Sequence, residues 1–342
     1  MKPIAITMGD PAGIGPEIVA KAYAQAPELT QGTFVVGDLA CMRRGAQVAA
    51  REGQPPLALA QIDEPGEAAG LPPRCIPVLQ AGTPPAQLPP TGQVSAEAGR
   101  LAADAVVWAA QAALGGDIAA LVTAPLHKEA LSAAGVPFPG HTELLQAEAA
   151  LHAGVAVEQM PVRMMLANDE LRTVLVSIHV ALRQALDAVT YERVLETLRI
   201  TDRTLARVLG HRPRIAVAGL NPHAGEGGLF GREELDVIVP AMQAGEREGL
   251  DLHGPFAPDT VFMRARRGEF DLVIAMTHDH GLIPVKYLGV EHGVNVTLGL
   301  PFVRTSPDHG TAFDIAGQQR ADPGSLTAAI RFARRLLAAA GR

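Results

Sequence analysis

The stretch IAITMGDPAGIGPEIVAKAYAQAPELTQGTFVVGD, residues 4–38, decides the fold class. A β-rich run over Ile4–Met8 is followed by a loop of glycine and proline, and then by a helical pattern from about Pro16. A second β-rich run covers Thr33–Val36. A strand, a helix and a strand in this order predict a βαβ unit whose strands lie parallel in one sheet.

The same alternation continues through the chain and predicts an α/β fold with a mostly parallel sheet. Two segments rich in proline and glycine, 53–74 and 81–92, are predicted to be loops. The later strands are predicted at Ile118–Thr123, Val162–Leu166, Thr173–Ile178, Ile215–Ala218, Leu272–Met276 and Val294–Leu298. The length of 342 residues suits two domains of roughly 150 residues each. No linker marks a boundary, so we expect the chain to pass between two lobes more than once.

Composition restricts the class of protein. Apolar residues make up 48% of the chain and aromatic residues 4%, which indicates a core of Ala, Val, Leu and Ile typical of parallel sheets. The net charge of −7 argues against a general nucleic-acid or membrane surface, but it allows a local basic pocket. Two cysteines are too few for a disulfide framework, and the longest apolar stretch, 106–126, is interrupted by polar residues. We therefore expect a cytoplasmic protein.

Three histidines come shortly after predicted strands: His179, His223 and His278. Ligands bind outside the carboxyl ends of strands in parallel sheets, so these side chains are candidates for one site. Three imidazoles suit a divalent metal with an open coordination position. A hydrogen bond to a backbone group is the alternative for any one of them, but three together favour a metal.

The surroundings of two of these histidines support a ligand site. His223 lies in the glycine-rich loop NPHAGEGG, residues 221–228, where the backbone can approach a ligand closely. Asp279 lies between His278 and His280, where it would ligate a metal or orient a histidine. A helix N-cap is the equally weighted alternative for Asp279.

Several residues are candidates for binding a phosphate or carboxylate group. His141 and Thr142 precede a helical run, and Thr142 is predicted to be the N-cap, so free amides of the first turn would face an anion near His141. Lys286, Asn295 and Arg304 lie near the C-terminal strands of an otherwise acidic chain. Arg304 is flanked by apolar and small residues, so its charge requires a specific partner. A surface ion pair is the alternative for each cation.

The GIG motif at residues 13–15 follows a strand and precedes a helix, which is similar to a dinucleotide-binding fingerprint. Ile18 replaces the third glycine of that fingerprint, and Glu17 places a negative charge where a pyrophosphate would lie. We therefore expect a dinucleotide elsewhere and interpret residues 9–17 as an active-site loop.

Four motifs, in this order, resemble those of the 4-hydroxythreonine-4-phosphate dehydrogenase family of vitamin B6 biosynthesis. They are TMGDPAGIGPE at 7–17, GHTE at 140–143, GLNPHAGEGG at 219–228 and GVNVTLGLPFVRT at 293–305. The resemblance covers nearly the whole chain and implies an isocitrate/isopropylmalate dehydrogenase-like fold, with two α/β lobes and a cleft between them. It also implies a homodimer with the active site at the interface. The expected lobes are residues 1–139 plus 305–342 on the cofactor side, and residues 140–304 for metal, substrate and dimerisation.

The resemblance also assigns site residues by motif. The family's metal ligands fall on His179, His223 and His278. Its substrate-binding residues fall on His141, Thr142, Lys286, Asn295 and Arg304. The segment HGTAFDIAG, residues 309–317, is similar to the stretch around the adenosine of NAD in the wider superfamily. The expected cofactor contacts are therefore His309, Gly310, Thr311 and Asp314.

The implied activity is NAD-dependent oxidation of 4-phosphooxy-L-threonine with loss of its carboxylate, which gives 3-amino-2-oxopropyl phosphate and carbon dioxide. A divalent metal assists the oxidation. Histidine ligands favour zinc or cobalt, and zinc is the first choice, while magnesium and manganese are alternatives. NADP is an alternative to NAD. Asp259 and Lys286 are equal candidates for the group that takes the hydroxyl proton.

Two histidines depart from the pattern of many members of the family. His280 stands where they have glutamine, and His292 precedes Gly293. Both adjoin expected ligands, so a dehydrogenase of 4-phospho-D-threonate or 4-phospho-D-erythronate is the alternative. A metallohydrolase that needs no NAD and a non-catalytic binding protein are further interpretations, but the HGTAFDIAG stretch favours the dehydrogenase.

Overall fold

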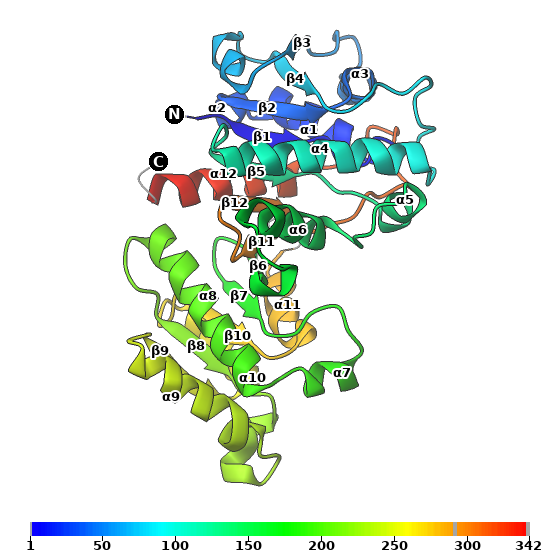
Figure 1. Ribbon diagram of the computed structural model, residues 1–342. Coiled ribbons are helices and arrows are strands. Elements are labelled where there is room, and N and C mark those ends of the chain that lie inside the picture. Colours follow the sequence, from blue (N-terminus) through cyan, green and yellow to red (C-terminus); the bar gives the residue numbers. More distant parts are fainter. Residues whose placement is uncertain (1, 290–292, 340–342) are drawn as a thin grey trace. The chain divides into compact units, whose positions relative to one another are not determined.

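A computed structural model describes residues 2–289 and 293–339 of the chain. They form two compact units, one of Met1–Pro161 with Leu300–Leu337 and the other of Val162–Gly299. Each unit has helices packed on a sheet (Figure 1). These boundaries differ from those expected after residues 139 and 304, because the helix that starts at His141 buries Leu144 in the core of the first unit.

The first unit has a parallel sheet with the strand order β3-β4-β2-β1-β5-β12. Its strands are β1 (Ile4–Thr7), β2 (Thr33–Gly37), β3 (Leu59–Ile62), β4 (Ile76–Gln80), β5 (Ala120–Thr123) and β12 (Val303–Pro307). β1 is central and buried along its length, since Ile4 lies beside Thr33 of β2 and Ala120 of β5. The βαβ unit predicted from residues 4–38 is confirmed.

Helices of the first unit cover this sheet. They are α1 (Gly15–Gln25), α2 (Pro27–Thr30), α3 (Leu39–Ala49), α4 (Ala96–Gly115), α5 (Lys128–Ala133), α6 (His141–Ala153) and α12 (Gly324–Ala339). α4 begins where the Ser95 hydroxyl accepts a hydrogen bond from the Ala98 amide, and it ends at Gly116, whose φ is 79°. Its small side chains, such as Ala109, pack against Phe34 and Leu121.

The second unit has a mixed sheet with the strand order β11-β6-β7-β10-β8-β9. Its strands are β6 (Arg163–Ala167), β7 (Arg172–Leu175), β8 (Ile215–Ala218), β9 (Leu252–Phe256), β10 (Leu272–Ala275) and β11 (Val294–Leu298). β6 is antiparallel to β7 and to β11, whereas β7, β10, β8 and β9 are parallel to one another. The predicted α/β fold with mostly parallel strands is therefore confirmed for the described residues.

The helices of the second unit are α7 (Leu182–Asp187), α8 (Tyr191–Leu209), α9 (Val239–Arg247), α10 (Pro258–Arg266) and α11 (His278–Tyr287). Two irregular segments, η3 (Pro222–Gly228) and η4 (Glu234–Ile238), connect β8 to α9. Side chains alternate across the sheet, so that Val273 and Ala275 of β10 face Val261 of α10 and Val285 of α11. None of the helices in the described parts of the chain has the length and apolar character needed to cross a bilayer.

The prediction of a loop over 53–74 is wrong. This segment contains β3 and the short helix η1 (Pro65–Gly70). β3 lies at the edge of the sheet and is only partly buried, so its sequence lacks the continuous apolar run of a central strand. β9 is also an edge strand and was missed for the same reason. The segment 81–92 has no helix or strand, as predicted.

Candidate active site

Buried polar atoms gather where β1 and β5 end. Thr7 Oγ1, Asp10 Oδ2, His127 Nδ1 and His141 Nε2 are all buried without a hydrogen-bond partner. Thr7 lies beside Thr123 at the ends of their strands, and the ring of His141 bonds to the backbone of Ala124. Native proteins pair nearly all buried polar groups, so this concentration indicates a place for a ligand.

Arg304 places a buried cation in the same region. Its side chain is only 3% exposed in β12, and its Nε and Nη2 donate to Thr123 Oγ1 at 3.2 and 2.7 Å. Burial lowers the pKa of Arg304 to about 10, while the negative charge of Glu143 acts to raise it. Burial and the Arg304 charge hold the pKa of His141 well below its usual value, so this imidazole is neutral at pH 7. A buried guanidinium beside a neutral ring suits an anionic ligand group.

The start of α6 adds free backbone amides. α6 begins at His141 with Gly140 as its N-cap, so the prediction that Thr142 is the N-cap is wrong. The Leu144 amide closes the first turn on the Gly140 carbonyl, which places His141 and Thr142 already inside the helix. No side chain caps the amides of this turn, and the positive end of the helix dipole lies there.

Asp10 and His127 are further candidates for this site. The sequence placed Asp10 only within the predicted loop at residues 9–17, and it did not single out His127. Asp10 is fully buried, its Oδ1 accepts a hydrogen bond from the Ala12 amide at 2.8 Å, and burial raises the pKa of its carboxyl. The His127 ring stacks on Phe313, with ring centres 4.8 Å apart. His127 follows β5 as closely as His179 follows its strand, so the same strand-end pattern would have found it.

The expected cofactor segment meets the predicted active-site loop. The Ile14 amide donates to the Thr311 carbonyl at 3.0 Å. Gly13 leaves no room for a side chain, since a Cβ there would lie 2.9 Å from Thr311 Cβ. Thr311 is buried at this contact, whereas Asp314 is exposed and the His309 ring bonds the carbonyl of Gly310.

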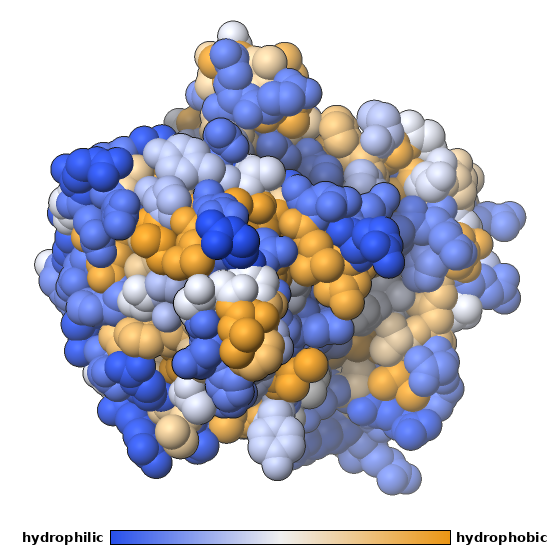
Figure 2. Space-filling view, turned by 90° about the horizontal axis from the view of Figure 1, so that it is seen from below, coloured by the Kyte–Doolittle hydropathy of each residue, from blue (hydrophilic) through white to orange (hydrophobic). Residues whose placement is uncertain are grey.

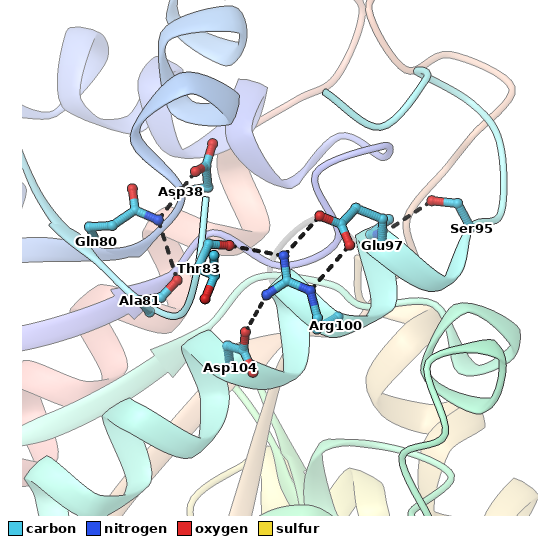
Figure 3. Close-up of polar contacts among 9 residues, drawn as sticks. Asp38, Gln80, Ala81, Thr83, Ser95, Glu97, Arg100 and Asp104 are labelled. Atoms are coloured by element: carbon cyan, nitrogen blue, oxygen red, sulfur yellow. Dashed lines mark hydrogen bonds and ion pairs between the residues drawn. The ribbon is translucent and has the colours of Figure 1, made fainter. Parts of the chain in front are cut away.

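The loop at residues 81–95 is bonded both to α4 and to the loop at residues 9–14. Arg100 of α4 bonds Glu97, Asp104 and the carbonyl of Thr83, as Figure 3 shows. This network ties the start of the 81–95 loop to α4. Further along the same loop, the Gly92 amide donates to the Ala12 carbonyl at 2.8 Å. Residues far apart in sequence therefore fix the backbone around residues 9–14.

The second unit brings two of the three predicted metal ligands together. The rings of His179 and His278 have centres 5.5 Å apart, and both line a pocket of about 430 Å³ beside α7. His278 Nδ1 lies 2.8 Å from Asp279 Oδ1, which leaves Nε2 to face a ligand. The N-cap of α11 is Thr277, so the interpretation of Asp279 as an N-cap is wrong. The interpretation of Asp279 as a partner that orients a histidine agrees with its contact with His278.

This histidine pair fits a metal, but the trio is not assembled within one chain. Two imidazoles bound to one tetrahedral ion at about 2.0–2.1 Å have ring centres roughly 5 Å apart, close to the spacing of this pair. Within residues 2–289 and 293–339, no three His, Cys, Asp or Glu side chains are placed to hold one ion. His223 lies elsewhere, in η3, with its ring 6.0 Å from that of Phe230.

The backbone at His223 is strained. His223, Ala224 and Glu226 have φ values of 53°, 53° and 42°, in the left-handed region that favours glycine. Each such residue costs about 1–2 kcal/mol relative to a right-handed conformation. Residues with unfavourable backbone angles are frequent at functional sites, where the surrounding structure holds them in place.

The other expected residues lie at separate places. Lys286 is half-buried in the last turn of α11, and Asn295 is half-buried in β11 opposite Leu166. Asp259 is exposed in the first turn of α10, and His280 is exposed on α11. His292 lies outside the described residues. The roles of these side chains stay predictions.

Comparison with known proteins identifies the family. The model of the pyridoxal phosphate biosynthetic protein PdxA family matches residues 30–333. The 4-hydroxythreonine-4-phosphate dehydrogenase of Beijerinckia indica is 51% identical over 98% of this chain and 95% of that protein. The chain belongs to the PdxA family. A second PdxA relative, the D-threonate 4-phosphate dehydrogenase of Salmonella typhimurium, is 45% identical over 98% of this chain and 99% of that protein.

Solved structures agree with PdxA membership over both units. The 4-hydroxythreonine-4-phosphate dehydrogenase of Klebsiella pneumoniae has a TM-score of 0.87 and 44% identity, and the match covers 98% of each chain. The terephthalate 1,2-cis-dihydrodiol dehydrogenase of Burkholderia xenovorans is more distant, with a TM-score of 0.66 and 31% identity over 97% of each chain. The predicted family resemblance is confirmed.

Proposed function

We propose that the chain is an NAD-dependent dehydrogenase that oxidises and decarboxylates 4-phosphooxy-L-threonine, which is 4-hydroxythreonine 4-phosphate, in pyridoxal 5'-phosphate biosynthesis. The observation that carries this proposal is the buried Arg304 beside the neutral His141 at the start of α6, in a chain of the PdxA family. Such a site suits the phosphate group that is common to the substrates named for its relatives.

The substrate's phosphate is anchored by the first unit. The Arg304 guanidinium neutralises the phosphate, and the amides of His141 and Thr142 at the start of α6 donate to its oxygens. Thr123 holds the guanidinium in place through the bonds to its hydroxyl. We assign Lys286 and Asn295 to the remaining polar groups of the substrate, as the family resemblance implies.

The chemistry requires a hydride acceptor and a divalent metal. When bound, NAD would be that acceptor, and the metal would lower the pKa of the hydroxyl that is oxidised. His179 and His278 of one chain would hold the metal, with zinc the best match to imidazole ligands, and Asp279 would fix the orientation of the His278 ring. Lys286 or Asp259 takes the hydroxyl proton. The resulting β-keto acid loses carbon dioxide, so the product is 3-amino-2-oxopropyl phosphate.

The third metal ligand, His223, is proposed to come from a second copy of the chain in a homodimer. The separation of His223 from the histidine pair within one chain supports this proposal. The second unit also exposes large apolar side chains, among them Leu182 at 68% and Ile283 at 63%. Figure 2 shows apolar groups in patches on one face, among hydrophilic side chains. Surfaces of this kind are typical of protein interfaces.

On the cofactor side, we assign NAD to His309, Gly310, Thr311 and Asp314, with NADP left open. The contact of Thr311 with Ile14 supports this assignment, because it places the segment against the loop at residues 9–14. The net charge of −7 is consistent with a protein that binds neither nucleic acid nor membrane. We place the protein in the cytoplasm, and Cys41 and Cys75 are both free thiols.

The second candidate substrate is D-threonate 4-phosphate, because relatives with that name match nearly the whole chain at 44–45% identity. It differs from 4-phosphooxy-L-threonine in the configuration of the chain and in carrying a hydroxyl where the other has an amino group at C2. The same reaction would then release dihydroxyacetone phosphate. Both compounds carry the phosphate group that the site at Arg304 and His141 suits.

The test is a spectrophotometric assay of NADH formation with both compounds, 4-phospho-D-erythronate and unphosphorylated 4-hydroxythreonine, with and without added zinc, magnesium, manganese or cobalt. We expect turnover of one phosphorylated compound, dependence on metal, and little turnover of the unphosphorylated control. Mass spectrometry of the product identifies which substrate was oxidised. Failure to form NADH from any phosphorylated hydroxy acid would falsify the proposal.

A further inference from the structure

A left-handed turn carries His223. All five residues from His223 to Gly227 have positive φ values between 42° and 78°. Because three of them are not glycine, the turn persists only if neighbouring groups hold it. The direction of the His223 imidazole depends on that turn, since His223 is its first residue.

The buried carboxylate of Glu234 bonds the backbone just before the turn. Glu234 is 2% exposed, and its Oε1 accepts hydrogen bonds from the amides of Leu220 and Asn221 at 2.7 and 2.8 Å. Its Oε2 accepts a third bond from Asn221 Nδ2 at 2.9 Å. A carboxylate can accept all three, because it has two acceptor oxygens and no donor of its own.

Glu234 also borders the turn itself. A Cβ at Gly225, in the middle of the turn, would lie 2.6 Å from Glu234 Oε2, and one at Gly219 would lie 3.0 Å from Oε1. The carboxylate therefore fills the space that these two glycines leave. Glu234 begins the π-helical turn η4, a form that is frequent at functional sites.

We propose that Glu234 is a positioning residue that holds the left-handed turn and so orients His223 toward the divalent metal. This inference rests on the proposed function, which takes His223 as a metal ligand. Glu234 itself acts through the backbone at residues 220 and 221 and need not touch the metal or the substrate.

Glu233 provides a matched control. It is the neighbouring residue, it is exposed, and its Oε2 accepts a hydrogen bond from Asn221 Nδ2 at 2.7 Å. Glu233 therefore shares the Asn221 side chain with Glu234 as a partner, but the amides of Leu220 and Asn221 bond Glu234 and not Glu233. The variant Glu233→Gln therefore shows the effect of losing one exposed charge beside the same loop.

The first measurement is hydrogen exchange of the metal-free full-length protein. In wild type the amides of Leu220 and Asn221 are bonded to Glu234 and should exchange slowly. In Glu234→Ala both should exchange at least tenfold faster, while amides of β8 and β10 keep their protection. Glu234→Gln should lie between the two, because one side-chain oxygen remains, and Glu233→Gln should match wild type.

The second measurement is zinc affinity, by competition with a chromophoric chelator. We expect the dissociation constant to rise roughly 10- to 100-fold in Glu234→Ala, the usual effect of removing a group that orients a metal ligand. The rise should be smaller in Glu234→Gln and absent in Glu233→Gln. Excess zinc should restore most of kcat in Glu234→Ala, which a general loss of structure would not allow.

The outcomes separate this inference from the proposed function. If His223→Ala binds zinc as wild type does, the proposed metal site is wrong, and so is the role of Glu234 in it. If His223→Ala loses zinc but Glu234→Ala keeps both amide protection and zinc affinity, only the inference about Glu234 is overturned. Should Glu234→Ala fail to fold, Glu234→Gln decides, since unchanged exchange and unchanged affinity in that variant overturn the inference equally.

Discussion

Replacing Arg304 by methionine tests whether this buried charge serves an anion or the fold. Burial lowers the pKa of Arg304 from 12.5 to about 10. At about 1.4 kcal/mol for each tenfold change, the folded chain disfavours the charged form by roughly 3 kcal/mol. Arginine is charged at pH 7 in the folded and unfolded states, so this is a cost of folding that methionine does not carry. Against it, the variant leaves the Thr123 hydroxyl without its donor, at about 1–3 kcal/mol.

The two terms nearly cancel, so we expect the free energy of unfolding of ligand-free Arg304→Met to be unchanged or up to about 2 kcal/mol higher. Binding of a phosphorylated ligand should respond differently. Loss of a charge-assisted hydrogen bond costs about 1.5–3 kcal/mol, or roughly a 10- to 150-fold weaker dissociation constant. The affinity for NAD should change much less.

Urea unfolding with and without inorganic phosphate or the phosphorylated substrate measures both effects, because a ligand stabilises the folded state in proportion to its affinity. Arg163→Met is the control. Arg163 is also buried, but its guanidinium bonds Glu196 and Thr197, so its loss should lower the free energy of unfolding without changing anion binding. If Arg304→Met instead unfolds more easily by over about 2 kcal/mol and is still stabilised by phosphate as wild type is, Arg304 is a structural residue.

Three further changes test other parts of the site. Mixing inactive His223→Ala and His278→Ala chains should restore roughly a quarter of wild-type activity, since half of the dimers are mixed and each has one intact site; no recovery would show that the two residues do not come from different copies. Because burial depresses the pKa of His141, the unfolded chain takes up a proton below about pH 6.5 and the folded chain does not, so stability should fall by up to about 1.4 kcal/mol per pH unit from there down to the folded pKa. In urea unfolding His141→Gln should remove this part of the slope, and an identical slope in the variant would contradict the burial argument. Gly13→Ala should raise the KM for NAD and cost about 1–3 kcal/mol of stability, because its Cβ would crowd Thr311; an unchanged KM would separate this contact from the cofactor.

Local patterns in the sequence were sufficient to predict most central strands and the family. Ile215–Ala218 and Val294–Leu298 are strands with the predicted bounds. Ile215–Ala218 is a short apolar run, and Val294–Leu298 alternates apolar and polar residues. The helix over Tyr191–Leu209 is capped by Thr190 and ended by Gly210, both of which are visible in the sequence. The motif around His223 likewise predicted a glycine-rich loop at which the backbone can approach a ligand closely.

What only the tertiary structure decided depends on contacts between segments far apart in the chain. Edge strands such as β3 obtain their hydrogen bonds from a neighbour rather than from an apolar run, so their sequences do not mark them. Arg304 is buried against Thr123, which is 181 residues away, and that burial sets its pKa. Strand order and packing bring His179 and His278 together and keep His223 apart from both. Packing also places the Glu234 carboxylate where it accepts hydrogen bonds from the backbone just before the turn that carries His223. No local pattern specifies those, because each depends on residues that the fold alone brings together.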